Sequence, residues 1–263
     1  MSIRTVAASR YVTPLREGGS LPAVIEADDD GLYVLKFRGA GQGTKALIAE
    51  LVSGELARAA GLPIPEIVFV ELDAELARSE PDPEIQDLIR ASVGRNLALD
   101  YLPGSVTFDP LAETVDADLA SAIVWFDAFI TNVDRTARNA NLLVWHRKLW
   151  LIDHGAALYF HHNWAHGADQ SRKPFALIRD HVLLPFAGAL EVADARMSAS
   201  ITPAVIASIV ATIPDDWLVD DPQFAGPDAA DLQRRAYRDY LAGRLQSPRS
   251  FVEEAVRARA ALA

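Results

Sequence analysis

The stretch ITNVDRTARNANLLVWHRKLWLIDHG, residues 130–155, decides the fold of this chain. It contains Asp134, an asparagine five residues later at Asn139, and a second aspartate at Asp153. Apolar segments on both sides of a polar turn predict a short β-hairpin between Asn139 and Asp153. Two carboxylates and an amide, held by a loop and a hairpin, are the groups that phosphoryl transfer from ATP requires.

Each of these positions answers a chemical demand of that reaction. The site must hold Mg²⁺ on the phosphates, orient an acceptor oxygen and neutralise developing charge. In kinase catalytic loops an Asp meets the acceptor hydroxyl and an Asn five residues later offers an oxygen to the metal, and Asp134 and Asn139 have this spacing. Asp153, with Gly155 two residues beyond it, stands where a second metal ligand is expected.

Upstream, the segment LYVLKF places Lys36 inside an apolar strand. A bare ammonium is poorly tolerated there, so a strand lysine of this kind should contact phosphates and be steadied by a glutamate. The helix predicted next, TKALIAELVSGELARAA from Thr44 to Ala60, offers both Glu50 and Glu55. Helical projection alone does not choose between them.

The N-terminal third of the chain combines strands with helices. Runs rich in Val, Ile, Tyr and Phe predict strands at 23–27, 32–37, 67–71 and 96–101. Apolar spacing predicts helices at 44–60 and 82–93. Thr44 is the expected N-cap of the first helix, and Gly61 is its expected stop.

The remainder of the chain is mainly helical in pattern. Helices are predicted over 117–130, 177–184, 202–212, 228–243 and 250–262. Ser250 and Glu253 form a capping-box pattern at the last of these, and the hairpin supplies the only strands expected here. We therefore predict a single α+β domain with two lobes, listed from the N-terminus: a small mixed N-lobe over 1–96, a hinge at 97–104 and a helical C-lobe over 105–263.

The composition limits the class of protein. At 263 residues, with 50% apolar and 23% charged residues, the chain resembles soluble globular proteins. No apolar run reaches the roughly 18 residues of a membrane span, and the N-terminus lacks the apolar core of a secretory signal, so a cytoplasmic location is expected. Zero cysteines excludes disulfides and thiolate chemistry. The net charge of -11 argues against a nucleic-acid partner, because that binding depends on Lys and Arg.

Taken together, these residues resemble the HipA-like kinases, which are relatives of the protein-kinase and phosphoinositide-kinase fold. The resemblance rests on Lys36 in its strand, on Glu50 with LARAAGLPIPE at 56–66 after it, and on the loop Asn132-Val133-Asp134-Arg135 with Asn139. Leu151-Ile152-Asp153 completes it. The resemblance implies a two-lobed protein-kinase-like fold that binds ATP and Mg²⁺ between its lobes.

The resemblance also implies roles for the catalytic-loop residues. Asp134 would be catalytic, and Asn139 and Asp153 would bind the metal. Arg135 and Arg138 lie inside the same loop, where contact with a phosphate or with the acceptor is expected. Asp127, in the helix before the loop, would brace it.

For the nucleotide, the resemblance gives Lys36 the phosphate contact and favours Glu50 over Glu55 as its partner. The adenine contact falls to the hinge residues Leu99, Asp100 and Tyr101. No G-x-G-x-x-G loop precedes the lysine, so the residues that could cover the phosphates through backbone N–H groups are Gly18, Gly19 and Ser20.

Two departures from the family pattern stand out. The loop has Thr136 after Asp134-Arg135, where many relatives have His, and His154 stands where protein kinases place Phe. The implied acceptor is the hydroxyl of a protein Ser or Thr, with a small molecule or a lipid headgroup as the second possibility. A nucleotide-binding pseudokinase that acts as an interaction module, or an enzyme that transfers AMP, is the alternative of a different class.

Two other motifs suggest different functions. The glycines of GAGQG at 39–43 lie between a strand and a helix, as in dinucleotide-binding folds. His161, His162 and His166, with Asp169 nearby, could bind zinc, although their spacing matches no common site.

Overall fold

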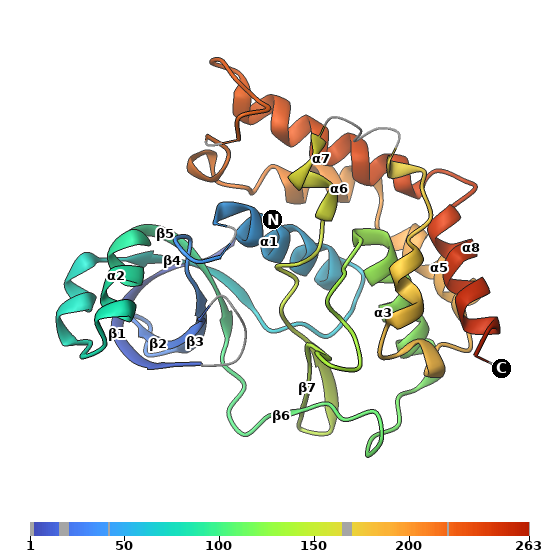
Figure 1. Ribbon diagram of the computed structural model, residues 1–263, viewed down its shortest axis with the longest axis horizontal. Coiled ribbons are helices and arrows are strands. Elements are labelled where there is room, and N and C mark those ends of the chain that lie inside the picture. Colours follow the sequence, from blue (N-terminus) through green and yellow to red (C-terminus); the bar gives the residue numbers. More distant parts are fainter. Residues whose placement is uncertain (1–2, 16–20, 42, 165–169, 220, 263) are drawn as a thin grey trace.

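The computed structural model describes residues 3–15, 21–41, 43–164, 170–219 and 221–262. Figure 1 shows a barrel of strands at one end of the molecule and a group of helices at the other. Helix α1 (Thr44–Ala59) lies between these two parts (Figure 1).

Five strands close into the barrel in the order β1-β2-β3-β5-β4. They are β1 (Thr5–Pro14), β2 (Ala23–Ala27), β3 (Leu32–Lys36), β4 (Ile67–Leu72) and β5 (Gly94–Asp100). The parallel pair β1 and β4 closes the ring, and the other neighbouring pairs are antiparallel. The sequence does not predict β1, because only Val6 in it is buried and the apolar alternation of a half-buried strand is missing.

The interior of the barrel is apolar. Helix α2 (Pro83–Ala91) adds Ile85 and Ile89 to the same cluster, and it begins as predicted at Asp82, whose side chain accepts a hydrogen bond from the amide of Glu84. The antiparallel pairing also overturns the dinucleotide-binding interpretation of 39–43, because the described strands do not form the parallel sheet of that fold.

Helix α1 is buried along most of its length. All residues from 47 to 57 are buried, and their apolar side chains belong to the core of the helical part rather than to the barrel interior. The N-cap predicted at Thr44 is wrong, because the cap position is Gly43, which has no side chain to accept a hydrogen bond. The predicted stop is confirmed: Gly61 has a φ of 76°, and the amides of Gly61 and Leu62 donate back to carbonyls of the last turn.

The helical part is built around α3 (Ala117–Ile130), which has the predicted bounds. Every residue of α3 from 120 onward is buried, and the Asp116 side chain caps it by accepting from the amides of Asp118 and Leu119. Further α-helices in the described residues are α5 (Leu190–Ser200), α6 (Pro203–Val210), α7 (Ala229–Leu245) and α8 (Ser250–Ala260). Helices α5 and α8 pack against α3, and α6 packs against α1.

The predicted hairpin forms as β7 (Leu142–Trp145) and β8 (Lys148–Leu151), and a short unpredicted strand, β6 (Val106–Thr107), pairs with β7. Short 3-10 helices connect the larger elements: η1 (Ala74–Ser79), η2 (Tyr159–His162), η4 (Ala176–Asp180), η5 (Leu184–Phe186) and η6 (Asp215–Trp217).

Two predictions for the helical part are wrong. The helix expected at 177–184 is replaced by η4 and η5, whereas α5 was not expected, because only three of its residues are buried and its apolar pattern is weak. Ser250 caps nothing, since its hydroxyl donates to the carbonyl of Arg172 and the cap position is Arg249.

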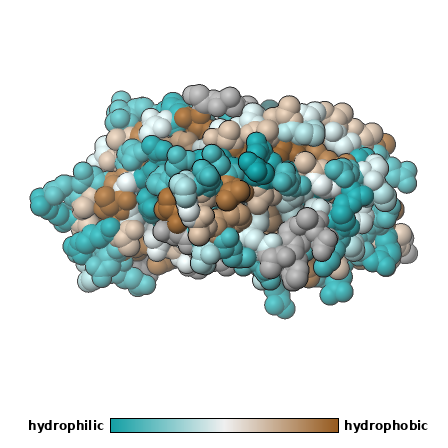
Figure 2. Space-filling model, turned by 90° about the horizontal axis from the view of Figure 1, so that it is seen from above, coloured by the Kyte–Doolittle hydropathy of each residue, from teal (hydrophilic) through white to brown (hydrophobic). Residues whose placement is uncertain are grey.

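The outer surface is mixed in character. The face in Figure 2 carries mainly hydrophilic side chains, with hydrophobic residues in small groups between them. Among the helices of the described residues, none combines the length and the apolar character needed to cross a membrane.

Candidate active site

The loop that follows α3 is shaped by its own side chains. Thr131 has a left-handed backbone, with a φ of 55°, and turns the chain out of the helix. The side-chain amide of Asn132 donates to Oδ1 of Asp127 at 3.0 Å, and its oxygen accepts from the amide of Asp134 at 3.1 Å. Asn132 therefore ties the backbone of Asp134 to the last turn of α3, independently of the contacts of the Asp134 carboxylate.

The loop brings Asp134 and Asn139 together. The side-chain amide of Asn139 donates to Oδ2 of Asp134 at 2.8 Å. A tight turn creates this contact, because the amides and carbonyls of Thr136 and Asn139 bond to each other at 2.9 and 3.2 Å. Asn141 also lies here, with its amide nitrogen 3.3 Å from the same carboxylate oxygen. The sequence signal for Asn141 was its position two residues after Asn139.

Lys36 joins the barrel to the loop and hairpin. Its Nζ lies 2.7 Å from Oδ1 of Asp153 and 3.8 Å from Oε2 of Glu50. The side chains of Lys36 and Glu50 are 13% and 1% exposed, whereas that of Asp153 is 39% exposed and faces solvent. Glu55 pairs with Arg58 of its own helix. Of the two glutamates between which helical projection could not choose, Glu50 is therefore the partner of Lys36.

Electrostatics keep Lys36 and Glu50 ionised. Burial acts to lower the pKa of Lys36, but Glu50, Asp153 and Asp134 outweigh it and raise that pKa above its ordinary value. Burial acts to raise the pKa of Glu50, and Lys36 with His154 holds it at about 2. Lys36 is thus an ammonium at neutral pH. Asp134 also raises the pKa of Lys36, so the Asp134 carboxylate lies close enough to interact electrostatically with the Lys36 ammonium.

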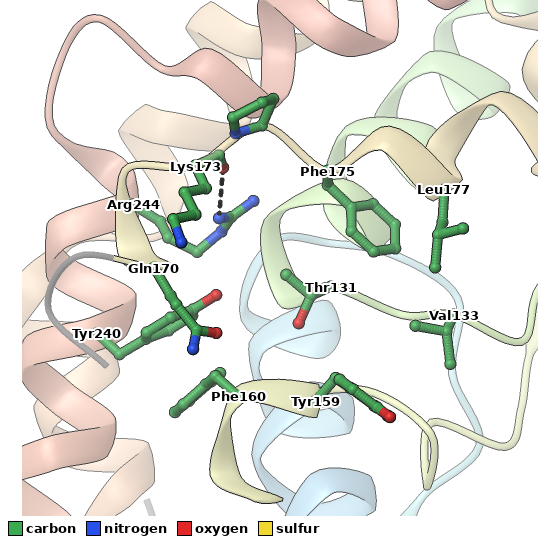
Figure 3. A pocket seen from close by; sticks show the side chains of 11 residues that line it. Thr131, Val133, Tyr159, Phe160, Gln170, Lys173, Phe175, Leu177, Tyr240 and Arg244 are labelled. Atoms are coloured by element: carbon green, nitrogen blue, oxygen red, sulfur yellow. Dashed lines mark hydrogen bonds between the residues drawn. The ribbon is translucent and has the colours of Figure 1, made fainter. Parts of the chain in front are cut away.

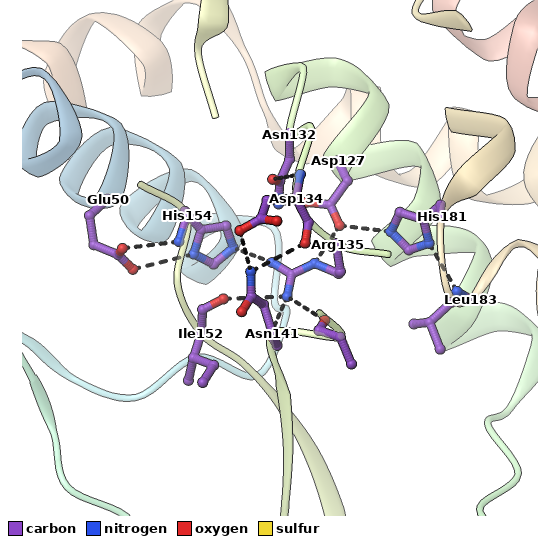
Figure 4. Close-up of polar contacts among 11 residues, drawn as sticks. Glu50, Asp127, Asn132, Asp134, Arg135, Asn141, Ile152, His154, His181 and Leu183 are labelled. Carbon is purple, nitrogen blue, oxygen red and sulfur yellow. Dashed lines mark hydrogen bonds and ion pairs between the residues drawn. The ribbon is translucent and has the colours of Figure 1, made fainter. Parts of the chain in front are cut away.

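Arg135 does not have the role expected of it. Its side chain is fully buried, and its Nε donates to Oδ2 of Asp127 at 2.6 Å. Its Nη1 donates to the carbonyls of Asn141 and Ile152, and its Nη2 lies 3.1 Å from Nε2 of His154 (Figure 4). All three nitrogens face protein, so contact with a phosphate or an acceptor is excluded. Arg138, in contrast, is exposed.

Asp127 braces the loop from α3. It accepts hydrogen bonds from Arg135 and from Nε2 of His181, the latter at 2.8 Å. The amide of Leu183 donates to the other ring nitrogen of His181, which fixes the ring hydrogen on Nε2. Burial acts to raise the pKa of Asp127, but Arg135 and His181 hold it well below its usual range. Asp127 is therefore a buried carboxylate with all its charge compensated locally.

The residues predicted to form the hinge lie at the end of β5, where their backbone amides have partners inside the barrel. The amide of Asp100 donates to the carbonyl of Glu66 at 2.8 Å, and that of Tyr101 donates to the carbonyl of Leu32 at 2.9 Å. Both amides complete the barrel, so neither can donate to an adenine, and Leu99 lies between β3 and β4 inside the sheet. Gly18, Gly19 and Ser20, predicted to cover the phosphates, lie outside the described residues.

The histidine cluster considered for zinc does not form a site in the part of the chain that the structure describes. His161 is buried, and its Nδ1 lies 2.9 Å from the hydroxyl of Tyr237. No group of three or more His, Cys, Asp or Glu side chains among the described residues could hold a metal ion by itself. His166 and Asp169 lie outside those residues.

A cavity of about 490 Å³ lies beside the loop that carries Asp134 (Figure 3). Thr131 and Val133, which precede Asp134, form part of its wall. Most of the remaining wall is aromatic or aliphatic, and two of its apolar side chains, Tyr159 and Leu177, are 60% and 48% exposed. The other lining residues are Phe160, Gln170, Lys173, Pro174, Phe175, Tyr240 and Arg244.

Comparisons with known proteins identify a family and a fold. A model of the HipA-like kinase family matches residues 9–242. The crystal structure of the Helicobacter pylori proinflammatory kinase CtkA is similar with a TM-score of 0.55 and 12% identity, over 98% of this chain and 99% of that one. The Golgi casein kinase, crystallised with Mn/ADP bound, has a TM-score of 0.52 and 12% identity, over 97% of this chain and 74% of that one. At these identities the likeness establishes a protein-kinase-like fold. No curated protein matches the chain.

Proposed function

This chain belongs to the HipA-like kinase family, and from that premise we propose that it transfers the γ-phosphoryl group of ATP to a hydroxyl in a Mg²⁺-dependent reaction. The observation that carries the proposal is the 2.7 Å contact between Lys36 and Asp153, which lie 117 residues apart in the chain. Glu50 flanks this pair, and Asp134 with Asn139 lies within its electrostatic reach. These are the side chains that phosphoryl transfer needs.

The donor atoms of the site fit Mg²⁺. That ion takes oxygen ligands and is usually held by one or two carboxylates together with water and phosphate oxygens. Asp153 offers a carboxylate that is 39% exposed, and Asn139 offers an amide oxygen while its nitrogen holds Asp134. When bound, Mg²⁺ would offset the negative charge of the phosphates. The Mn/ADP in the Golgi casein kinase structure supports this assignment.

Each residue then has one task in the transfer. Lys36 contacts the phosphates, and Glu50 holds its ammonium in place. Asp134 orients the acceptor hydroxyl and takes its proton as the new O–P bond forms and the bond from the γ-phosphorus to ADP breaks. Asn139 fixes one carboxylate oxygen of Asp134, which directs the other toward the acceptor. Arg135 acts from the protein interior by holding the loop.

We propose that ATP binds between the barrel and the helical part, and that the acceptor is a protein Ser or Thr. The cavity beside the loop supports a polypeptide acceptor, because Val133 lines it and directly precedes Asp134. Its apolar wall, with Tyr159 and Leu177 exposed, suits an apolar side chain near the acceptor residue. A small-molecule or lipid acceptor remains the second candidate.

The experiment that tests the reaction uses ATP labelled at the γ or at the α phosphate, with a cell extract and a small-molecule panel as acceptors. We expect γ label on an acceptor with the wild-type protein and none with Asp134→Ala. Asp87→Ala is the matched control, because Asp87 is 80% exposed and only pairs with Arg90 on the surface. Transfer of α label would mean AMP transfer, and nucleotide binding without any transfer would indicate a pseudokinase. Mass spectrometry of the labelled species identifies the acceptor.

A further inference from the structure

Asp153 is held in an unfavourable backbone conformation. Its φ is 54°, which lies in the left-handed region where a side chain with a β-carbon is disfavoured. The residue is an aspartate rather than a glycine, and it lies two residues after the last strand of the hairpin, which ends at Leu151. Neighbouring contacts must therefore hold the chain in this conformation.

The contacts that hold it come from both sides of Asp153. On one side, the carbonyl of Ile152 accepts from Nη1 of Arg135 at 3.3 Å. On the other side, the amide of His154 donates to Oε2 of Glu50 at 3.0 Å, and Nε2 of its ring lies 3.1 Å from Nη2 of Arg135. Arg135 thus contacts both neighbours of Asp153. It meets Ile152 at the backbone carbonyl and His154 at the side-chain ring.

The hydrogen on the His154 ring can be placed from its partners. A guanidinium only donates hydrogen bonds, so Nε2 of His154 must accept from Arg135 and the ring hydrogen must lie on Nδ1. Nδ1 faces Oε1 of Glu50 at 3.6 Å, and these two atoms have no closer hydrogen-bond partner among the described residues. The ring is fully buried and packs edge-on against Phe126 of α3.

We propose that His154 is a positioning residue that ties the Lys36–Glu50 pair to the catalytic loop through Arg135. The chain of contacts runs from Glu50 on α1 through His154 and Arg135 to Asp127 on α3, as Figure 4 shows. It fixes the direction of the Asp153 carboxylate by holding the residue that follows it. The role in catalysis rests on the proposed kinase function, but the hydrogen-bond geometry does not.

Three variants of His154 separate its two contacts. In His154→Gln the amide oxygen can occupy the place of Nε2 and still accept from Arg135. In His154→Asn the amide nitrogen can occupy the place of Nδ1 and face Glu50, but the side chain is too short for Arg135. His154→Phe keeps a ring of similar size without either contact. His146→Asn is the control, because His146 is an exposed turn residue whose φ of 48° Asn tolerates.

We expect the loss of the Arg135 contact to lower kcat about 10- to 100-fold in His154→Phe and His154→Asn, as for a lost hydrogen bond to a charged group. The KM for ATP should change less than about threefold, because neither variant removes a phosphate contact. His154→Gln should recover most of kcat. Equal kcat in all three variants and the wild type, or no recovery in His154→Gln, overturns the proposal.

Nitrogen NMR of the wild-type protein gives a second test that needs no activity. With ¹⁵N-labelled histidine and His154→Gln to assign the signal, we expect the hydrogen of the His154 ring on Nδ1. A hydrogen on Nε2 overturns the proposal even if the protein is an active kinase. If the hydrogen lies on Nδ1 but the protein transfers no phosphate, the proposed kinase function fails while the hydrogen-bond geometry of His154 stands.

Discussion

Replacing Lys36 with Met should destabilise the protein as well as stop phosphate transfer. The change leaves Glu50 buried, 1% exposed, without its cation. The pKa of Glu50 is about 2 against an ordinary 4.5, and this difference corresponds to about 3 kcal/mol of stability near neutral pH. For a chain of this length that is a fall in Tm of roughly 6 to 12 °C. Removing one partner of a buried ion pair typically costs a similar amount, about 3 to 5 kcal/mol.

The pH dependence gives the sign of the effect. The folded pKa of Glu50 lies below its unfolded value, so its contribution is complete above about pH 4.5 and is lost as the pH falls toward about 2. The gap in stability between wild type and Lys36→Met should therefore be largest near pH 7 and narrow below pH 4.5. Denaturant unfolding at several pH values measures it, with Lys148→Met as the exposed control.

A second substitution isolates the buried charge. In Lys36→Met with Glu50→Gln the uncompensated carboxylate is gone, so stability should return while activity stays absent. If Lys36→Met unfolds like the wild type at pH 7, or if its deficit is the same at pH 3 and pH 7, the assignment of Lys36 and Glu50 as a mutually stabilising pair is refuted.

Other substitutions test the remaining parts of the site. Asp153→Asn should abolish the Mg²⁺-dependent part of ATP binding, measured by calorimetry with and without the metal, and unchanged Mg²⁺ dependence would contradict its role. Arg135→Lys should lower stability by about 3 to 5 kcal/mol in chemical unfolding, because one ammonium cannot replace the fork that meets Asp127 and two carbonyls. Leu177→Asp should reduce transfer to polypeptide acceptors about tenfold or more while ATP binding is unchanged, and equal loss of both would argue against an acceptor role for the cavity.

The order of the chemical groups along the chain was the part that sequence could predict. Asp134, Asn139 and Asp153 have a spacing that a short turn and a hairpin impose, and both elements form from local pattern. Lys36 was predictable because an ammonium in an apolar strand needs a partner. Helical projection alone could not separate Glu50 from Glu55, and only the family resemblance favoured Glu50, because α1 is buried on nearly all faces and the choice depends on where Arg58 and Lys36 lie.

Contacts between distant segments were not predictable. Arg135 directly follows Asp134, yet neighbouring side chains in a loop point in different directions, and only the fold shows that the Arg135 side chain turns inward. The use of the Asp100 and Tyr101 amides inside the barrel was not predictable for a similar reason, because their partners Glu66 and Leu32 lie far away in the sequence. The contact between His154 and Glu50 spans 104 residues and depends on that same arrangement.

The burial of helix α1 has a consequence for control of the enzyme. Its residues 47–57 are covered, largely by the core of the helical part, so the helix cannot swing outward without uncovering that whole segment to water. Glu50 is therefore anchored on a buried helix, and Lys36 is the member of the site carried by the barrel. Any movement of the barrel relative to α1 would therefore change the distance between Lys36 and Glu50, and with it the electrostatic balance of the site.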